Sequence, residues 1–499
     1  MITNRFEPKI KIDEFSFGSK DVYGKDENDV KIGQSVVKQI GNAFPAIKIN
    51  NKLFYYNEIE YFELNCEGKI PEVTLILSFV FDKTFAFKDV PKDGDVINVF
   101  IRSNSEKLKP IRNDFIIKDA EFIGSDNQSV SSKMYVKIYA ELYIPKFYEP
   151  ISQTIDDTSF NTLQQIAKQL DLGFNSNIEN TNDKQKWIAP STSYLEFIDF
   201  ICNSAYKDDK SFFTWFIDIY YNLNFIEVNK EILDASKNKI YKQLVENTTL
   251  FSIHFDDKEH KGVIDKILSN HPGTANSNSF VREYNLVNNT KNIVDLMGYR
   301  WYNNFYEHDS GKFWSIFTEP LITDGAEKEK ILLRGRPHDD SYKLNYKYEW
   351  MGIQYSLPNH NVHKNYLLSK TINRMNNLEL EKMYIYVKLN KINLNFIKYE
   401  NIPVLLFVTK NPVTSDIVRT EKEEETIKKE NVYPNDFLTI NKFYSGNYIM
   451  TGFKIIYEQP TNIESNSQYF EYGLSNVSGF TQVFKLARRE WNLYKAEKI

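Results

Sequence analysis

Cysteine is scarce in this chain of 499 residues, which carries only Cys66 and Cys202. Two cysteines are too few for the disulfide framework that stabilises small secreted domains. Cys202 lies on the apolar stripe of an expected helix, so we interpret it as a small core residue. The cysteine content excludes a disulfide scaffold and favours a chain made in a cytoplasm.

Long hydrophobic runs are also missing. No apolar stretch approaches the ~20 residues that a membrane helix needs. The N-terminal segment Met1–Lys11 is polar and lacks the apolar core of a signal peptide. We therefore expect a soluble chain without membrane insertion.

A basic excess is absent as well, because the formal net charge is −5 and the charges are spread along the chain. A protein that grips phosphate backbones normally carries more Lys and Arg than Asp and Glu. The balance argues against nucleic acid as a gripped ligand. It is compatible with a channel through which DNA passes in transit.

Motifs for catalysis are lacking: the chain has no Gly-x-Ser-x-Gly elbow, phosphate loop or Gly-rich dinucleotide fingerprint. The only close histidine pair, His360 and His363, lacks the Glu and the spacing of a helical zinc site, so we expect polar residues at a helix start or on the surface. The cluster His254–His260 matches no ligand spacing, and Arg334–Pro337 is best explained as a charged turn. We predict no catalytic residue, no metal site and no cofactor. A carboxylate pair for glycoside hydrolysis stays open, because Asp and Glu are abundant.

Apolar residues, at 41%, and charged residues, at 26%, are present in the proportions of a folded protein. The chain is too long for one core, so we expect two to four domains. Aromatic residues are abundant at 15%, with 36 Phe and 32 Tyr. Aromatic rings favour strands and interfaces, and an AT-rich genome explains the same bias equally well.

The middle of the chain gives the clearest pattern. A helical period follows the cap candidates Asp157–Ser159 and is expected to stop at Gly173. The sequence Ser193-x-x-Glu196 predicts a capping box at the start of a second helix. Two aromatic and β-branched runs, Phe212–Tyr220 and Leu223–Val228, then predict a hairpin. Such a module suits a scaffold better than an enzyme.

Both ends of the chain are predicted to be strand-rich, as a barrel or a sandwich. Their similar size suggests an internal duplication of a barrel. The expected strands of the first part are 44–49, 53–56, 73–81, 96–101, 115–117, 120–123 and 134–144, and those of the last part are 384–389, 404–408, 436–440 and 448–457. The charge-dense run Arg419–Glu430 is interpreted as a solvated loop or short exposed helix.

The order of these parts resembles the baseplate hub protein of contractile-tailed phages, a family that also supplies the N-terminal half of the VgrG spike proteins. Asn161–Phe174, followed by Trp187, is similar to the family's middle segment. Pro91–Val99 resembles the Gly-Asp turn that leads into a tube-type barrel strand. Ser445–Phe453 resembles the last barrel's strand, and Asn359–Lys382 resembles the hub's linker helix.

The resemblance implies an α+β, β-rich fold, with two tube-type antiparallel β-barrel domains and an α+β connector domain between them. The first barrel is assigned to residues 1–150 and the connector, of two helices and a hairpin, to 151–235. An irregular, strand-containing region at 236–358 extends the connector or the second barrel. A helix at 359–383 then leads into the second barrel at 384–499.

In such a family the hub is a homotrimer whose ring adapts the sixfold tail tube to the threefold central spike. The implied partners are the chain itself, the tail tube protein and the spike protein, with the tape-measure protein and baseplate wedge as further candidates. The implied location is the virion tail, assembled in the cytoplasm of the host bacterium. Two alternatives remain: the hub of a phage-derived injection system without a genome, and a β-rich protein that binds or hydrolyses glycans.

Overall fold

The computed structural model of the chain describes 18 stretches. They are residues 2–10, 45–50, 52–54, 58–80, 91–101, 109–123, 133–236, 267–270, 279–289, 301–307, 311–318, 350–356, 362–381, 383–389, 392–409, 438–441, 444–458 and 480–488. The predictions for His254–His260, Arg334–Pro337, His360 and Arg419–Glu430 lie outside these residues.

One large sheet of 13 strands dominates the fold, and it is antiparallel except where β14 pairs with β20. Its N-terminal strands are β2 (Ala46–Ile49), β3 (Lys52–Phe54), β4 (Ile59–Asn65), β5 (Glu72–Val80), β6 (Val96–Ile101), β7 (Ile111–Ile123) and β8 (Lys133–Leu142). Its C-terminal strands are β14 (Leu268–Ser269), β15 (Val281–Asn288), β19 (Met383–Leu389), β20 (Asn401–Leu405), β23 (Gly446–Glu458) and β24 (Phe480–Ala487).

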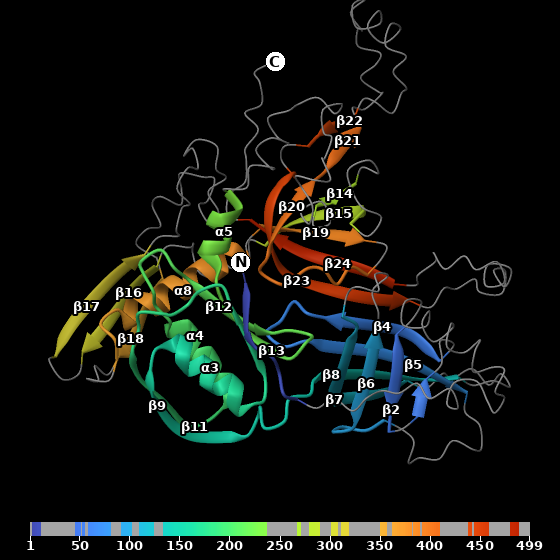
Figure 1. Ribbon diagram of the computed structural model, residues 1–499, viewed down its shortest axis with the longest axis horizontal. Coiled ribbons are helices and arrows are strands. Elements are labelled where there is room, and N and C mark those ends of the chain that lie inside the picture. Colours follow the sequence, from blue (N-terminus) through green and yellow to red (C-terminus); the bar gives the residue numbers. More distant parts are fainter. Residues whose placement is uncertain are drawn as a thin grey trace, which may run out of the picture.

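The two sets of strands lie side by side in this sheet, as the blue and red arrows of Figure 1 show. The order is β15-β19-β24-β23-β4-β5-β8-β7-β6-β2-β3, and β20 and β14 branch from β23. We call β2–β8 the N-terminal half and β14, β15, β19, β20, β23 and β24 the C-terminal half. Residues far apart in sequence therefore share one sheet.

Alternation of apolar and polar residues explains why these segments are strands with one covered face. In β19, Ile385, Val387 and Leu389 are fully buried, whereas the residues between them are half-buried. The same alternation appears in β24. A period of two puts one set of side chains on the core and the other set on the open face.

The connector contains a second sheet, ordered β1-β10-β13-β12. Its strands are β1 (Thr3–Phe6), β10 (Gly173–Ser176), β12 (Phe213–Ile217) and β13 (Asn222–Glu227), accompanied by the paired strands β9 (Pro150–Asp157) and β11 (Gln185–Ser193). Its helices are α3 (Ser159–Gln169), α4 (Tyr194–Ser204) and α5 (Val228–Ser236). The predicted hairpin is confirmed, because β12 and β13 pair antiparallel. The strand β1, from a segment described only as polar, was missed.

The helix ends follow the capping predictions at two of three places. Ser193 and Glu196 form the expected capping box at α4, and Thr158 caps α3. The predicted stop of α3 at Gly173 is wrong. Asp171, with φ of 55°, provides the left-handed residue after the helix, while Gly173 already belongs to β10. A Cβ on Gly173 would meet the Asn222 side-chain oxygen and would lie 3.0 Å from the Phe6 carbonyl oxygen of β1, so crowding from both neighbouring strands explains this glycine.

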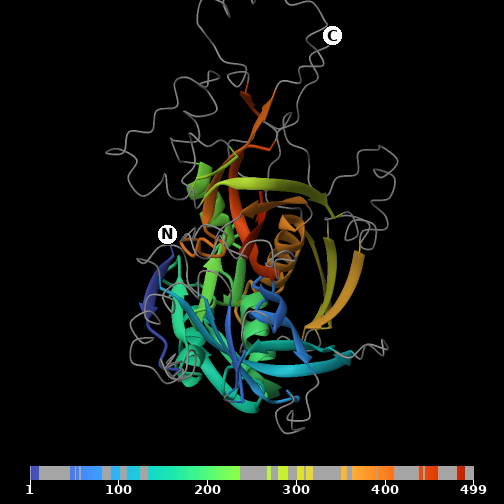
Figure 2. The same ribbon diagram turned by 90° about the vertical axis from the view of Figure 1, so that its right-hand side faces the viewer.

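The remaining elements stand beside this frame. The three-stranded sheet β17-β16-β18 consists of β16 (Trp301–Glu307), β17 (Lys312–Thr318) and β18 (Trp350–Ser356), and a small pair consists of β21 (Phe407–Thr409) and β22 (Leu438–Ile440). The helix α8 (Tyr366–Leu380) is shorter than the predicted 359–383. It packs against α4, with the three-stranded sheet to its other side, as the two views show (Figures 1 and 2).

A single apolar core joins both halves of the large sheet to the connector. Phe62 and Leu75 of the N-terminal half, Ile455 of the C-terminal half and Phe225 of the connector all belong to it and are fully buried. The β-rich α+β class is confirmed by this arrangement. Among the described strands, the pairings run openly from β15 to β3, so closure of each half into a barrel stays a prediction.

Candidate functional site at the seam of the large sheet

The seam between the two halves is made by β23. Along one edge, β23 pairs with β24 over Ile449–Tyr457. Along its other edge it pairs first with β20, over 446–449, and then with β4, over Lys454–Glu458. The pairing of β23 with β24 shifts register between Met450 and Gly452. At this point the other edge of β23 changes its partner from β20 to β4. A β-bulge at this point bends and twists the strand, which lets one strand serve both halves.

The turn after β4 lies directly against β23. The Cys66 backbone N–H donates to the Phe453 carbonyl oxygen at 2.8 Å and extends the seam by one bond. A Cβ on Gly452 would lie only 2.7 Å from the Glu67 Cα atom. This approach explains why residue 452 is a glycine. Only the smallest residue leaves room for the neighbouring backbone.

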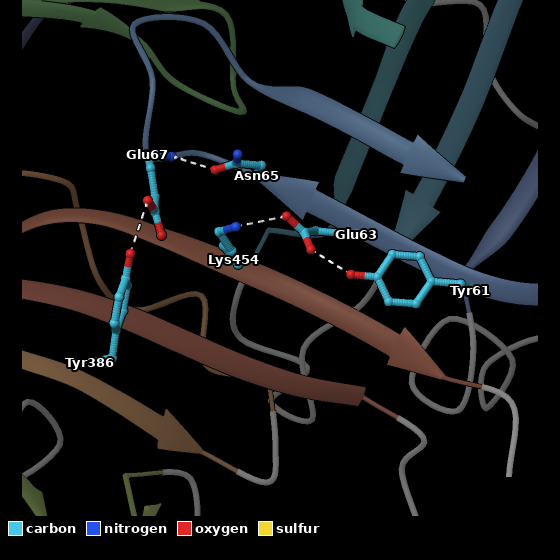
Figure 3. Close-up of polar contacts among 6 residues, drawn as sticks. All are labelled: Tyr61, Glu63, Asn65, Glu67, Tyr386 and Lys454. Atoms are coloured by element: carbon cyan, nitrogen blue, oxygen red, sulfur yellow. Dashed lines mark hydrogen bonds and ion pairs between the residues drawn. The ribbon is translucent and has the colours of Figure 1, made fainter. Parts of the chain in front are cut away.

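Polar side chains line the open face of the seam (Figure 3). The Lys454 ammonium forms an ion pair with Glu63 at 2.9 Å, and the Tyr61 hydroxyl donates to the other oxygen of Glu63. Burial and the Glu63 carboxylate raise the pKa of Tyr61. Farther along, the Tyr386 hydroxyl of β19 donates to Glu67 at 3.4 Å. These contacts bridge β23, β4 and β19 across the seam.

The same turn also binds the connector. The Ile217 backbone N–H donates to the Lys69 carbonyl oxygen at 2.8 Å, and the Lys69 ammonium donates to the Thr214 hydroxyl at 3.1 Å. The Lys69 ammonium also lies 5.4 Å from the centre of the Trp215 ring, within the range of a cation–π contact. The connector hairpin is therefore fixed to the seam by both backbone and side-chain bonds.

A buried lysine completes the junction. Lys398, only 6% exposed, donates to the carbonyl oxygens of Glu67 at 3.0 Å and Gly68 at 2.6 Å. Burial, together with the charge of Lys69, lowers the pKa of Lys398 to about 7. A small cavity of about 50 Å³ lies beside Lys398, and the Cys66 side chain is among those lining it.

The described residues do not assemble a catalytic constellation at this seam. No group of three or more His, Cys, Asp or Glu side chains could hold a metal ion within the described parts of the chain. Burial raises the pKa of both Glu141 and Glu227 to about 7, but they lie in different sheets. Glu227 accepts the Lys230 backbone N–H at the start of α5, which gives it a capping role. The contacts at the seam hold strands and turns of the chain together.

Sequence reasoning found one of the two strands of the seam. The strand at 448–457 was predicted and corresponds to β23, whereas β4 was missed. The pairing of these two strands was not predicted either, and neither were the roles of Lys398, Glu67 and Gly452. Of the predicted histidine pair, His363 is buried at the start of α8 rather than on the surface. No helix in the described parts has the length and apolar character of a membrane span.

Comparison with known proteins gives structural similarity only. Neither a protein-family model nor a curated protein sequence matches the chain. The fold is similar to a tail protein from Neisseria meningitidis MC58, with 8% identity, a TM-score of 0.42, and coverage of 90% of this chain and 97% of that protein. It is also similar to the 43 kDa tail protein of prophage MuSo2 from Shewanella oneidensis, with 10% identity, a TM-score of 0.43, and coverage of 89% and 98%.

A third similar structure is the half-lidded PdpA–VgrG complex of Francisella, with 10% identity and a TM-score of 0.40. The match covers 92% of this chain and 61% of that one. These are tail and VgrG proteins, the class to which the sequence resemblance pointed. Because the TM-scores lie below 0.5, the fold assignment rests on the strand order above and not on the alignments.

Proposed function

We propose that this chain is the structural hub of a phage-tail baseplate, a homotrimeric ring between the sixfold tail tube and the threefold central spike. The observation that carries the proposal is the seam. One polypeptide supplies two strand-built halves and joins them edge to edge through β23 and β4. Three such chains would provide six halves around one axis, which matches a sixfold partner on one side and a threefold partner on the other.

The ends of the sheet supply the contacts that such a ring needs. Among the described strands, the path ends at β15 on one side and at β3 on the other. Strands at the end of a sheet can template pairing with another chain, so they suit contacts between neighbouring subunits. In this proposal each half is a tube-type barrel, and the hub lines a conduit through which DNA passes.

The partners in this proposal are the tail tube protein and the spike protein, with the tape-measure protein and baseplate wedge as further contacts. The role is structural rather than enzymatic, and the place of action is the virion tail, after assembly in the host cytoplasm. In this proposal the function depends on interfaces with other subunits and with the partner proteins. The polar clusters among the described residues hold elements of the chain together.

The test is the solution mass of the purified chain, alone and mixed with a candidate spike protein. We expect a trimer of about three times the chain mass of 58.8 kDa, at the latest when the spike is present. A chain that stays monomeric in both samples contradicts the proposal. A monomer that retains glycans on an array would support a glycan-binding protein instead. A trimer from a gene cluster without capsid genes would support a genome-free injection system.

A further inference from the structure

Docking of α8 on α4 depends on buried polar side chains. The Asn373 side-chain amide donates to the carbonyl oxygens of Cys202, Asn203 and Ala205 at 3.3, 3.1 and 2.9 Å. Its Oδ1 atom accepts the Phe213 backbone N–H at 2.9 Å. Asn373 is fully buried. This one side chain therefore contacts both the end of α4 and β12.

The reason for this docking lies in the end of α4. The last carbonyl groups of a helix have no partner within the helix and must be satisfied from outside. The Ser369 hydroxyl of α8 donates to the Ser204 carbonyl oxygen at 3.0 Å, and Asn377 donates to the Phe213 carbonyl oxygen at 2.8 Å. The polar residues of α8 thus cap a neighbouring helix.

A histidine closes this contact just before α8. The Nε2 atom of His363 lies 3.1 Å from the Ser204 carbonyl oxygen, and its backbone N–H donates to the Gln185 side chain at 3.2 Å. A carbonyl oxygen only accepts, so Nε2 carries the hydrogen. The ring stacks on Tyr206 and meets Tyr366 edge-on, with centroids at 6.0 and 5.9 Å.

The surroundings of this ring favour its neutral form. The Nδ1 atom is buried and finds no hydrogen-bond partner among the described residues. A proton there would create a buried donor without an acceptor beside the positive end of the α8 dipole. The buried Asp183 carboxylate opposes this effect, although it already accepts the Ser159 and Tyr206 backbone N–H groups.

Among the other charged groups on these elements, the Lys370 ammonium of α8 lies 4.7 Å from the centre of the Tyr366 ring, and Asp199 of α4 accepts the Trp215 indole N–H at 3.0 Å. Lys184, next to Asp183, and Lys364, next to His363, are both exposed. Asp209, also exposed, accepts the hydroxyl of Tyr206, the ring that stacks on His363. No described lysine or arginine side chain hydrogen-bonds to the imidazole, so the balance is set by burial, which lowers the pKa of His363, and by the Ser204 carbonyl oxygen and Asp183, which raise it.

We propose that His363 makes the α8–α4 contact a pH-sensitive latch, which opens when the buried imidazole takes up a proton. The opening frees α8, which joins the three-stranded sheet to the C-terminal half, from the connector. This inference concerns the chain by itself and does not depend on the proposed trimer.

The direction of the effect follows from linkage. Burial lowers the pKa of His363 below its ordinary value of 6.5. The released form therefore binds a proton at a higher pH than the docked form does. Docking is fully stable above pH 6.5, and its stability falls as the pH drops from there toward the lowered pKa.

Hydrogen exchange of the α8 amides at pH 7.5 and pH 5.5, each divided by the intrinsic rate, tests the latch. Protection of local structure reports the equilibrium of its opening. The opening constant of the wild type should rise on acidification, by at most about tenfold, because pH 5.5 lies one unit below the ordinary pKa of 6.5. His363→Gln keeps a donor near Ser204 but cannot take up a proton, so its protection should be the same at both pH values.

A second variant separates loss of docking from loss of titration. Asn373→Ala removes the side-chain amide that contacts three carbonyl oxygens at the end of α4, so α8 should exchange faster at both pH values and keep the wild-type ratio between them. The other six histidines are unchanged in all three proteins. The latch is refuted if α8 protection in the wild type ignores pH, or if His363→Gln responds to acid as the wild type does.

Discussion

The two junctions of this molecule are held in different ways. At the seam, β23 and β4 share a backbone ladder, and the core beneath them is continuous from one half to the other. At the α8–α4 contact, side-chain amides and hydroxyls carry the connection, led by Asn373 and Ser369. A ladder with an apolar core is cooperative, whereas a contact made by a few buried polar groups can open locally.

The difference shows where rigidity and where mobility are expected in one chain. The seam has to keep two halves in fixed register, since a slip of one residue would turn the buried face outward. The contact of α8 has no such register, and its polar groups can exchange the α4 carbonyls for water. We therefore expect mutations at the seam to act on global stability and those at α8 to act on local opening.

The largest effect is expected from Gly452→Ala at the seam. The added Cβ would lie 2.7 Å from the Glu67 Cα atom, a backbone atom that cannot move without shifting the turn. Overpacking of this kind costs about 3 kcal/mol of unfolding free energy. The denaturant midpoint of the purified variant measures the loss.

Gly68→Ala provides the matched control, because it lies in the same turn and its added Cβ would be 3.6 Å from the nearest atom, the Ile70 carbonyl oxygen. Its midpoint should stay within about 0.5 kcal/mol of the wild type. Equal stability of both alanine variants would show that the seam does not need the close approach at Gly452.

A smaller effect, of about 2 kcal/mol, is expected from the pH dependence of Lys398. Because its pKa is lowered to about 7 in the folded protein, the unfolded chain binds the proton more tightly between pH 7 and its ordinary value of 10.5. Folding stability from this group is therefore lost as pH falls from 10.5 toward 7 and regained as pH rises. From pH 7 to pH 9, the wild type should gain about 2 kcal/mol of unfolding free energy relative to Lys398→Met.

Denaturation at the two pH values measures this difference directly. Lys364→Met removes an exposed lysine and should follow the wild type at both. A Lys398→Met variant whose stability changes with pH as the wild type's does would mean that this lysine is not the source. The comparison also distinguishes the charge from the two hydrogen bonds, because the loss of those bonds is the same at both pH values.

The smallest effect is expected at the Glu63–Lys454 ion pair. Its side chains are 17% and 27% exposed, so solvent and salt weaken the attraction. Glu63→Gln should cost about 0.5 kcal/mol at low salt, and the cost should shrink in 1 M salt. A loss well above 2 kcal/mol would mean that charge, rather than the backbone ladder, holds the seam.

The predictions succeeded where neighbours in sequence are neighbours in space. The Ser193–Glu196 capping box and the β12–β13 hairpin depend on residues a few positions apart, so their patterns were sufficient. The helix that contains Asn373 was predicted, as 359–383, but the sequence did not reveal the role of this asparagine. Its purpose became visible only when α4 lay beside it.

The amino-acid sequence by itself determined the capped starts of α3 and α4 and the β12–β13 hairpin, since period, caps and turns are local properties. The tertiary structure decided which strands are neighbours, so β4 and β23, almost 400 residues apart, share one ladder. It also determined the close backbone approach that requires a glycine at position 452, the burial that lowers the pKa of Lys398, and the position of His363. These properties depend on burial and on the backbone of distant segments, and a linear pattern contains neither.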